Sequence, residues 1–321
     1  MSLSPDISVI VPAYNEEESL RELNDWISRV MTSHGLSYEI LLIDDGSTDS
    51  TWEKIVELSV SNPHCKGLRF ARNHGKSAAL HTGFQHAAGR VVITMDADLQ
   101  DSPDEIPGLF TMITEDGYDL VSGWKKKRHD PIGKTLPSKF FNFVTGKISG
   151  IKLHDFNCGL KAYRNVVVKN IDVYGEMHRY IPVICKWHGF SKIGEKVVQH
   201  QPRKYGVTKF GMERFVTGFL DLISVTFVSK FRKKPMHFFG LLGTLSFLAG
   251  FFITAWLIGQ KIWSLYRHQV FRDIVDQPLF YLALVAIVIG VQLFLAGFLA
   301  EMYAMANERN ARYLLIDKVG L

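Results

Sequence analysis

Two long runs without a charged residue constrain the fold of this chain more than any other feature. One runs from Phe238 to Gly259 and the other from Leu279 to Ala300, and each is 22 residues long. As helices they would measure about 33 Å, which matches the hydrocarbon thickness of a bilayer. The alternative, two helices buried in a protein core, is disfavoured because an α/β domain made of the remaining residues has no room to enclose both. We therefore predict two transmembrane helices.

Basic residues beside the two spans indicate their orientation. Four lie at 230–234 before the first span, and three lie at 309–318 after the second. Because cytoplasmic flanks are rich in Lys and Arg, both flanks are predicted to be cytosolic, although Arg267 and Arg272 in the connecting loop weaken this asymmetry. Met1 to Asp6 lack the features of a signal peptide. The prediction is a multi-pass protein of the plasma (inner) membrane, with the N-terminal domain and both termini in the cytosol.

The first third of the chain alternates short apolar runs with helical patterns. Helices are predicted at 17–31, 51–60 and 77–88, and another begins at 102–104. The predicted strands are Ile7 to Val11, Glu39 to Ile43, Cys65 to Phe70, Val91 to Met95 and Leu120 to Gly123. Strands separated by single helices of about a dozen residues need parallel crossovers. The predicted fold class is therefore α/β, with a mostly parallel sheet and helices on both faces.

A polar motif follows each of the first four predicted strands. The motifs are Pro12 to Glu16, Asp44 to Ser47, Arg72 to Lys76 and Asp96 to Asp101. Since the carboxyl ends of parallel strands share one edge, the four loops should converge where open α/β sheets bind ligands. Independent structural turns would not need so many charged groups in one place.

The fourth motif offers ligands for a hard cation. The strand Val91 to Met95 ends in Asp96, Ala97 and Asp98, and alternate side chains of an extended chain share a side, so Asp98 and Gln100 can face one way. Their oxygens suit a divalent ion that keeps coordination positions open for phosphate. The competing interpretation, an Asp-rich turn that caps the next helix, is the commoner case for a DxD pattern alone. The other three motifs favour a ligand site.

Missing patterns exclude several other classes of site. No GxGxxG follows the first strand and no GxxxxGK[ST] occurs, which counts against a dinucleotide enzyme or a P-loop NTPase. Cys65, Cys158 and Cys185 lie far apart and are odd in number, so neither a disulfide framework nor a zinc site is indicated. The basic clusters at 125–128 and 203–209 accompany no nucleic-acid-binding pattern. They favour phosphate groups or anionic lipid over nucleic acid.

Together the four motifs resemble those of a known enzyme family. VPAYNE, IDDGSTD, RNHGK and DADLQD, in this order and at these spacings, resemble inverting family 2 glycosyltransferases of the GT-A fold. The closer similarity is to polyprenyl-phosphate glycosyltransferases, such as dolichol-phosphate mannose synthase and the bacterial undecaprenyl-phosphate glucosyl and aminoarabinose transferases. The resemblance continues through Asp155 to Tyr163 and Gly206 to Gly211 to the two spans. It covers nearly the whole chain.

The resemblance implies a nucleoside diphosphate sugar, UDP- or GDP-linked, as the donor and Mg²⁺ or Mn²⁺ as the cofactor. Carboxylates suit the base and ribose, which present N–H and O–H donors. Asp98 and Gln100 would hold the metal against the diphosphate, where it neutralises the leaving group. The residues implied in binding the nucleotide sugar are Pro12, Tyr14, Glu16, Asp44, Lys76, Asp96 and Ala97.

The resemblance also implies a polyprenyl phosphate acceptor, undecaprenyl or dolichyl. Such a phosphate is already ionised at neutral pH, so cationic side chains that position it matter more than a strong general base. The residues expected to contact the lipid phosphate are Lys125, Arg128, Lys204 and Lys209, and the expected catalytic residues are Asp96, Asp98, Asp155, Arg203 and Lys209. The chain departs from the family pattern at two positions. Lys161 stands where arginine is usual, and Trp124 stands where some relatives have arginine. A lysine cannot form the bidentate fork of an arginine.

The chain divides into four predicted segments. They are a GT-A glycosyltransferase domain at 1–210, a juxtamembrane amphipathic helix at 211–235, a transmembrane hairpin at 236–306 and a cytosolic tail at 307–321. Amphipathic patterns at 139–148 and 214–231 would lie in the headgroup plane, close to a lipid substrate. Ordinary core packing explains the first pattern equally well.

The predicted function is metal-dependent transfer of a single sugar to a polyprenyl phosphate at the cytosolic membrane face, with inversion. A processive polysaccharide synthase is the alternative enzyme, and the absence of a QxxRW segment and the small number of spans disfavour it. A non-catalytic membrane scaffold that kept the fold is the alternative from another class, and the intact Asp96, Asp98 and Gln100 disfavour it. The sequence leaves open the sugar, the nucleotide, the metal, the length of the acceptor and the oligomeric state, with a homo-oligomer among the possibilities.

Overall fold

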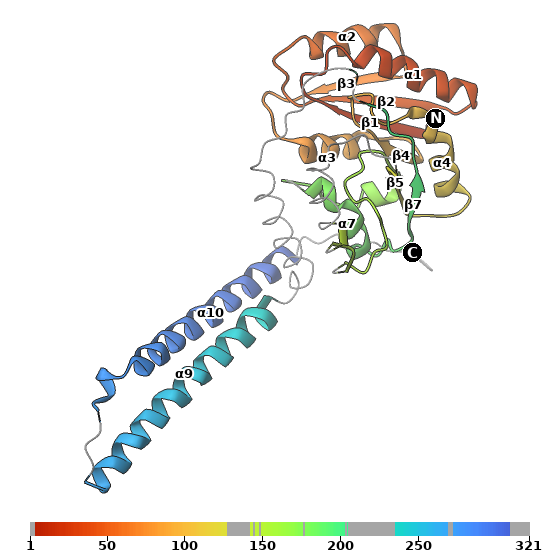
Figure 1. Ribbon diagram of the computed structural model, residues 1–321. Coiled ribbons are helices and arrows are strands. Elements are labelled where there is room, and N and C mark those ends of the chain that lie inside the picture. Colours follow the sequence, from red (N-terminus) through yellow and green to blue (C-terminus); the bar gives the residue numbers. More distant parts are fainter. Residues whose placement is uncertain are drawn as a thin grey trace. The chain divides into compact units, whose positions relative to one another are not determined.

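The computed structural model describes residues 4–126, 142–143, 145–147, 149–175, 177–202, 204, 235–268 and 272–308. The chain divides into two compact units, an N-terminal α/β unit and a C-terminal helical hairpin (Figure 1), and the division falls within the undescribed stretch 205–234. The predicted amphipathic segment at 214–231 lies outside the described residues, and so does most of the predicted tail at 307–321. The bounds of the four predicted segments therefore stay predictions.

A seven-stranded mixed sheet forms the centre of the α/β unit. Its strands are β1 (Ile7–Ala13), β2 (Tyr38–Asp44), β3 (Cys65–Arg69), β4 (Val91–Thr94), β5 (Leu120–Trp124), β6 (Lys161–Arg164) and β7 (Ile193–Val197). They lie in the order β3-β2-β1-β4-β6-β5-β7, and only β6 runs antiparallel to its neighbours, β4 and β5. The prediction of a mostly parallel α/β sheet is confirmed. The sequence did not predict β6 or the half-exposed edge strand β7, because neither is a long apolar run.

Helices cover both faces of this sheet (Figure 1). On one face, helices α1 (Leu20–Ser33), α2 (Thr51–Ser61) and α4 (Ile106–Thr114) share a core cluster with β1, β2 and β4. On the other face, helices α3 (Lys76–His86), α6 (Asn165–Val168) and α7 (Ile181–Trp187) share a second cluster. Two short 3-10 helices, η1 (Pro103–Glu105) and η2 (Met177–Tyr180), precede α4 and α7.

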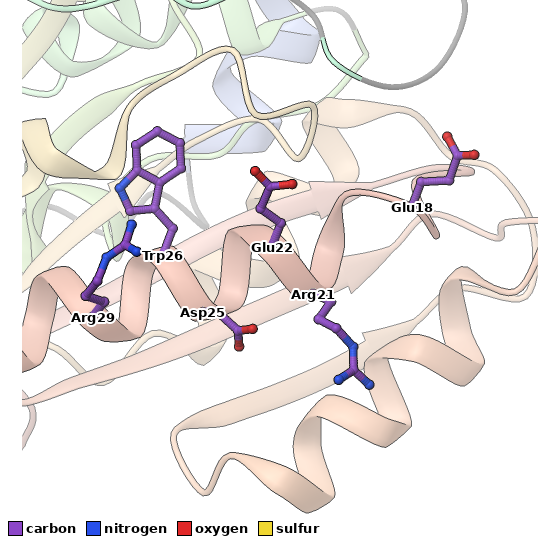
Figure 2. Close-up of a pocket in the computed structure, with 6 residues that line it drawn as sticks. All are labelled: Glu18, Arg21, Glu22, Asp25, Trp26 and Arg29. Carbon is purple, nitrogen blue, oxygen red and sulfur yellow. The ribbon is translucent and has the colours of Figure 1, made fainter.

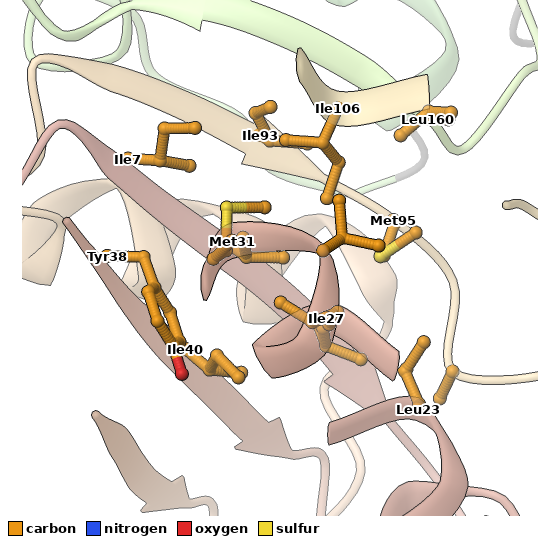
Figure 3. Packing of buried hydrophobic residues seen from close by; sticks show 14 of the residues in the cluster. Ile7, Leu23, Ile27, Met31, Tyr38, Ile40, Ile93, Met95, Ile106 and Leu160 are labelled. Carbon is orange, nitrogen blue, oxygen red and sulfur yellow. The ribbon is translucent and has the colours of Figure 1, made fainter. Parts of the chain in front are cut away.

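The two clusters follow from the alternation of side chains along buried strands. In β1, Val9 and Val11 belong to the first cluster, whereas Ile10 belongs to the second. Figure 3 shows Ile27 and Met31 of α1 packing over the first cluster. Burying each such aliphatic side chain completely stabilises the fold by about 1.5–3 kcal/mol relative to leaving it exposed. The core therefore fixes the strands, and the strands fix where the loops at their carboxyl ends begin.

The C-terminal unit is a pair of long helices. They are α9 (Pro235–Tyr266) and α10 (Pro278–Glu308), and the short 3-10 helix η3 (Ile274–Asp276) lies in the connection. Both helices are long and apolar enough to cross a membrane, and most of their large side chains are exposed. They are candidate membrane spans, as predicted from the uncharged runs.

Small residues at seven-residue spacing hold the two helices close together. A Cβ added to Gly290 would lie 2.6 Å from the backbone nitrogen of Phe247, and one added to Gly250 would lie 2.5 Å from the carbonyl oxygen of Ala283. The contact positions are Gly243 and Gly250 of α9 and Ala283, Gly290 and Gly297 of α10. A seven-residue repeat keeps one seam in contact along a left-handed helix pair.

Two polar groups of the hairpin find partners within it. Ser246 Oγ donates to the carbonyl oxygen of Ala286 at 2.8 Å. Near the start of α9, the backbone N–H of Met236 donates to Oε2 of Glu301 at 3.1 Å. Glu301, to which the sequence assigned no role, therefore satisfies one of the open donors at a helix N-terminus.

Candidate active site

The loops that follow β1 and β2 are joined by hydrogen bonds centred on Asn15. This residue has a positive φ of 55°, which Asn adopts more readily than most residues. Its backbone N–H donates to Ser47 Oγ at 2.9 Å, and its Oδ1 accepts from the Thr48 N–H at 2.9 Å. The backbone N–H of Glu16 donates to Thr51 Oγ1 at 2.8 Å. The two loops predicted to bind the nucleotide therefore form one hydrogen-bonded surface.

The two adjacent acids after β2 have different partners. Asp44 is fully buried, its Oδ1 accepts from the Ser47 N–H at 2.9 Å, and its Oδ2 lies 3.2 Å from Arg69 Nε. Asp45 instead accepts from the backbone N–H groups at 74–75, at 2.7 and 2.9 Å, and so ties the second loop to the third. The role of Asp44 in donor binding stays a prediction. Asp45 was not singled out from the sequence, although it organises the loop.

Gly46 brings the backbones of the second and third loops into contact. Its φ is 70°, and an added Cβ would collide with the backbone of Arg72 and lie 2.7 Å from the nitrogen of Asn73. Only glycine adopts this conformation without strain and leaves room for the neighbouring chain. The third loop therefore packs directly against the second.

An ion pair joins the third and fourth loops. Lys76, the first residue of α3, donates from Nζ to Oδ1 of Asp96, and both side chains are 32% exposed. Burial by itself raises the pKa of Asp96, but the charge and the hydrogen bond of Lys76 outweigh it and lower the pKa to about 2. Asp96 is therefore a carboxylate at neutral pH. The structure brings together two residues that the sequence placed in different motifs.

The segment before β6 packs against this ion pair. A Cβ added to Gly159 would lie 2.6 Å from Oδ2 of Asp96, and Thr94 Oγ1 donates to the Gly159 carbonyl oxygen at 2.9 Å. Lys161 is buried, and its Nζ donates to the carbonyl oxygen of Cys158. Burial lowers the pKa of Lys161. The stretch from Cys158 to Lys161 therefore lies beside Asp96.

His178 and Ser77 are further residues of this region, and sequence reasoning missed both. The backbone N–H of His178 donates to Ser77 Oγ at 3.0 Å, and its Nδ1 lies 3.1 Å from the same oxygen. Burial and the nearby charge of Lys76 lower the pKa of His178 well below its ordinary value, so the imidazole is neutral at pH 7. A lone histidine in η2 belongs to none of the motifs and gave no signal in the sequence.

The residues after Asp96 form a turn rather than an extended chain. Leu99 has a positive φ of 59°, and the Gln100 N–H donates to Oδ1 of Asp98 at 3.2 Å. The extended geometry expected for Asp98 and Gln100 is therefore wrong, and a backbone turn brings the two residues together instead. The Gln201 N–H donates to the Gln100 carbonyl oxygen at 2.8 Å, which fixes this turn to the segment after β7.

The residues present fit a metal site that protein and substrate would complete together better than one made of protein ligands alone. No group of three or more His, Cys, Asp or Glu side chains is placed to hold a metal within the described part of the chain. Asp98 and Gln100 offer the oxygen ligands that Mg²⁺ and Mn²⁺ prefer. Two such ligands would leave the other coordination positions to water and to substrate phosphate.

Lys125 is turned toward the interior of the unit. Its Nζ lies 2.7 Å from Oδ1 of Asp101, and the two side chains are 13% and 0% exposed. Burial by itself lowers the pKa of Lys125, but the carboxylate of Asp101 raises it well above the ordinary value. Lys125 therefore neutralises the buried acid of the fourth loop, a partner that the sequence did not indicate. Its predicted contact with lipid phosphate stays a prediction.

Asp155 lies in a loop that Glu195 of β7 holds in place. Glu195 Oε1 accepts from the backbone N–H groups of His154 at 2.8 Å and Asp155 at 3.0 Å. Asp155 is buried, and its Oδ1 accepts from the Asn157 N–H at 3.0 Å. The ring of His154 stacks on Trp124 with 4.0 Å between centroids. The loop conformation is fixed from both sides, and a catalytic role for Asp155 stays a prediction.

Other predicted site residues are divided between the rim and the undescribed stretches. Tyr14 is 36% exposed in the first loop, whereas Pro12 belongs to β1 and Ala97 is buried. The predicted residues that lie outside the described part of the chain are Arg128, Arg203 and Lys209.

Lys204 forms an ion pair with a residue of α1. Its Nζ lies 2.7 Å from Oε2 of Glu22. Glu22 also lines a hollow of about 470 Å³ along α1 (Figure 2). The lining residues are Glu18, Arg21, Glu22, Asp25, Trp26 and Arg29. None of them is a residue predicted to bind the donor or the metal, so this hollow is not the predicted site. The lipid-phosphate role of Lys204 stays a prediction.

The part of the chain that carries these loops matches a known family. Residues 8–172, from β1 past β6, match the model described as glycosyl transferase family 2. The chain therefore belongs to glycosyltransferase family 2, and it is a glycosyltransferase. It is also 35% identical over 310 residues to dodecaprenyl-phosphate galacturonate synthase from Rhizobium johnstonii, a match that covers 96% of this chain and 90% of that protein.

Solved structures share the fold at lower identity. Glucosyl-3-phosphoglycerate synthase from Mycobacterium tuberculosis, in complex with Mn²⁺, UDP and glucosyl-3-phosphoglycerate, superposes with a TM-score of 0.54 at 20% identity, covering 70% of this chain and 79% of that one. Mannosyl-3-phosphoglycerate synthase from Rubrobacter xylanophilus gives a TM-score of 0.55 at 16% identity, covering 68% and 73%. The predicted GT-A fold is confirmed.

Proposed function

We propose that this glycosyltransferase moves a single sugar from a nucleoside diphosphate sugar to a polyprenyl phosphate in the membrane. The observation that carries the proposal is the 35% identity to the galacturonate synthase over 96% of the chain, because that length includes both the four loops and the helical hairpin. Two apolar helices suit an enzyme whose acceptor cannot leave the bilayer.

The donor would bind along the loops that follow β1, β2 and β4. Asp96 is ionised there, and a carboxylate accepts hydrogen bonds from sugar or ribose hydroxyl groups. Lys76 stands at the N-terminus of α3, where its charge and the helix backbone both favour phosphate oxygens. Uridine and guanosine both present groups that such side chains can bind.

The oxygens of Asp98 and Gln100 would hold Mg²⁺ or Mn²⁺, which supplies positive charge against the leaving nucleoside diphosphate. Asp98 contributes a carboxylate to this role and Gln100 an amide oxygen. Lys125 cancels the charge of Asp101 in the same loop. The fourth loop therefore places no uncompensated Asp101 charge near Asp98.

The acceptor phosphate would act as the nucleophile. One of its oxygens bonds to the anomeric carbon while the nucleoside diphosphate leaves with the bonding electron pair from the opposite face, so the configuration inverts. Two anions must approach for this step, and cationic side chains offset their repulsion. Lys76 is a partly exposed cation among the described residues, and we propose Arg203 and Lys209 as further ones.

We further propose that the α/β unit and both termini are cytosolic. The basic residues at 230–234 and 309–318 support this orientation by the positive-inside tendency. Nucleoside diphosphate sugars would then be available on the same side as the loops.

The proposal is tested by sugar transfer with full-length protein in vesicles that contain undecaprenyl phosphate and Mn²⁺. Sugar-labelled UDP-galacturonate, UDP-glucose and GDP-mannose are compared, with the first as the leading candidate because of the named relative. We expect one donor to deliver label into the organic-extractable fraction, and the delivery to require both the acceptor lipid and the metal. Label that ends in free sugar or in a polymer would contradict the proposal.

A further inference from the structure

A polar side chain lies in the middle of a candidate span. Gln292 is near the midpoint of Pro278–Tyr303, the part of α10 that is apolar enough to cross a membrane, and its side chain is exposed. Its amide makes no hydrogen bond with any residue that the structure describes. An amide facing hydrocarbon without a partner is strongly unfavourable, since the bilayer core has no water to replace the missing bonds.

Two hydroxyl groups of the hairpin, by contrast, are satisfied inside it. Ser246 Oγ donates to the Ala286 carbonyl oxygen at 2.8 Å, and Thr254 Oγ1 donates to the Gly250 carbonyl oxygen at 2.9 Å. Gln292 therefore differs from these hydroxyl groups, and its partner must come from outside the hairpin.

The geometry of α10 directs Gln292 away from α9. Gly290 faces α9, and two further residues at about 100° each turn the helix by about 200°. On this outward side, large apolar residues alternate with Gln292 at spacings of three and four. We call this set the Gln292 seam, and it consists of Val285, Val288, Gln292, Leu295 and Leu299, all of them exposed. The seam has the a and d spacing of a helix pair with one polar residue at an a position.

We propose that two copies of this chain pair through the Gln292 seam, with the two Gln292 amides hydrogen-bonded to each other. An amide carries both donors and an acceptor, so an identical amide is its complement. All copies insert in the same orientation, so their α10 helices run parallel, and a twofold axis along the membrane normal brings equal-numbered residues together. The inference rests on the membrane placement of α10 and not on the identity of the sugar or acceptor.

Cysteine cross-linking in vesicles tests the seam without altering Gln292. The three native cysteines are all buried, so the background reaction is low. Leu295→Cys and Leu299→Cys variants should form disulfide-linked dimers on mild oxidation. The control is Phe298→Cys, which is also exposed but lies about 120° around the helix from Gln292. Equal cross-linking at 298, or none at 295 and 299, would overturn the proposal.

Energy transfer between donor-labelled and acceptor-labelled copies tests the amide itself. We expect Gln292→Leu to raise the dissociation constant in lipid about 3-fold to 30-fold, the range that interhelical polar contacts support. Gln260→Leu removes an amide near the far end of α9, outside the seam, and should leave the constant unchanged. An unchanged constant in Gln292→Leu would overturn the proposal. Sugar transfer is assayed separately, so loss of pairing is distinguishable from loss of activity.

Discussion

At the carboxyl edge of the sheet, charged side chains are held by one another. Lys76 pairs with Asp96, and Lys125 pairs with Asp101. Each lysine lowers the cost of placing a carboxylate in a partly desolvated loop. Asp96 and Asp101 are therefore fixed before a substrate binds, which suits a site that must receive a charged donor in a defined position.

Replacement of Asp98 should lower the rate of sugar transfer more than replacement of any other residue of the candidate site. We expect Asp98→Asn to lower sugar transfer about 10²-fold to 10³-fold, the usual cost of removing one electrostatic contact to the reacting groups. The variant should also need more Mn²⁺ for half-maximal rate. Asp25→Asn, an exposed acid on α1, is the matched control and should transfer sugar normally. Full activity in Asp98→Asn would remove this residue from the metal site.

The depressed pKa of Asp96 predicts a pH dependence of stability. Because the folded-state pKa of about 2 lies below the ordinary 3.8, ionised Asp96 stabilises the fold above about pH 4, and this contribution is lost as the pH falls toward 2. The gap in melting temperature between wild type and Asp96→Asn should thus be constant at neutral pH and close in acid. A gap that widens on acidification would show that the Lys76 pair does not lower the pKa.

The sequence predicted which residues belong to the site better than it predicted which residues they pair with. Asp96 and Lys76 were placed in the site by motif resemblance, and the structure brings them into contact. The inward pairing of Lys125 with Asp101 and the anchoring role of Asp45 depend on loop conformation, which motif spacing does not encode. His178 belongs to no motif and lies far from Ser77 in the sequence, so only the folded chain brings the two together.

At the scale of elements, glycines decide how closely backbones approach. The second and third loops touch at Gly46, and α9 and α10 touch along the seven-residue repeat that contains Gly290. The alternation of strands and helices was readable from apolar periodicity, whereas β6 and β7 were not, because their pairing in the sheet is set by tertiary contacts. The seven-residue repeat of small residues was missed for another reason. Within an apolar run, the role of a glycine becomes visible only when the contacting helix is known.

Gly46→Ala should disrupt the site more than Gly35→Ala. Both glycines have positive φ, 70° and 64°, so both variants carry the backbone strain of about 1–2 kcal/mol. Only at 46 does the new methyl group meet the backbone at 72–73, while nothing lies within 4 Å of it at 35. We expect a lower melting temperature and weaker nucleotide binding in Gly46→Ala than in the control. Equal effects would mean that the two loops are not in contact.

Gly290→Ala should weaken the hairpin, and Gly259→Ala should not. A Cβ at 290 would lie 2.7 Å from the Gly243 carbonyl oxygen, whereas Gly259 has nothing within 4 Å. Overpacking costs about 1–3 kcal/mol, while an open glycine in a helix gains about 0.5–1 kcal/mol on replacement by alanine. Unfolding of the full-length protein in detergent measures both changes. Stabilisation by Gly290→Ala would contradict the close packing of α9 and α10.

The whole molecule joins a family 2 glycosyltransferase unit to a hairpin of two candidate spans. Residues 8–172 carry the family match, and the similarity to the galacturonate synthase continues across 96% of the chain. The combination suits the proposed reaction, because a nucleotide donor is soluble in water and a polyprenyl chain is not. The two runs of 22 uncharged residues predicted the candidate spans directly, because apolar runs of this length have few alternatives.

The central claim is most directly tested by the stoichiometry and mass of the product made from undecaprenyl phosphate. The account predicts one nucleoside diphosphate released for each lipid molecule converted, and a lipid whose mass has grown by a single sugar residue. Nucleotide release without a glycosylated lipid, or a product that carries many sugar residues, would contradict it.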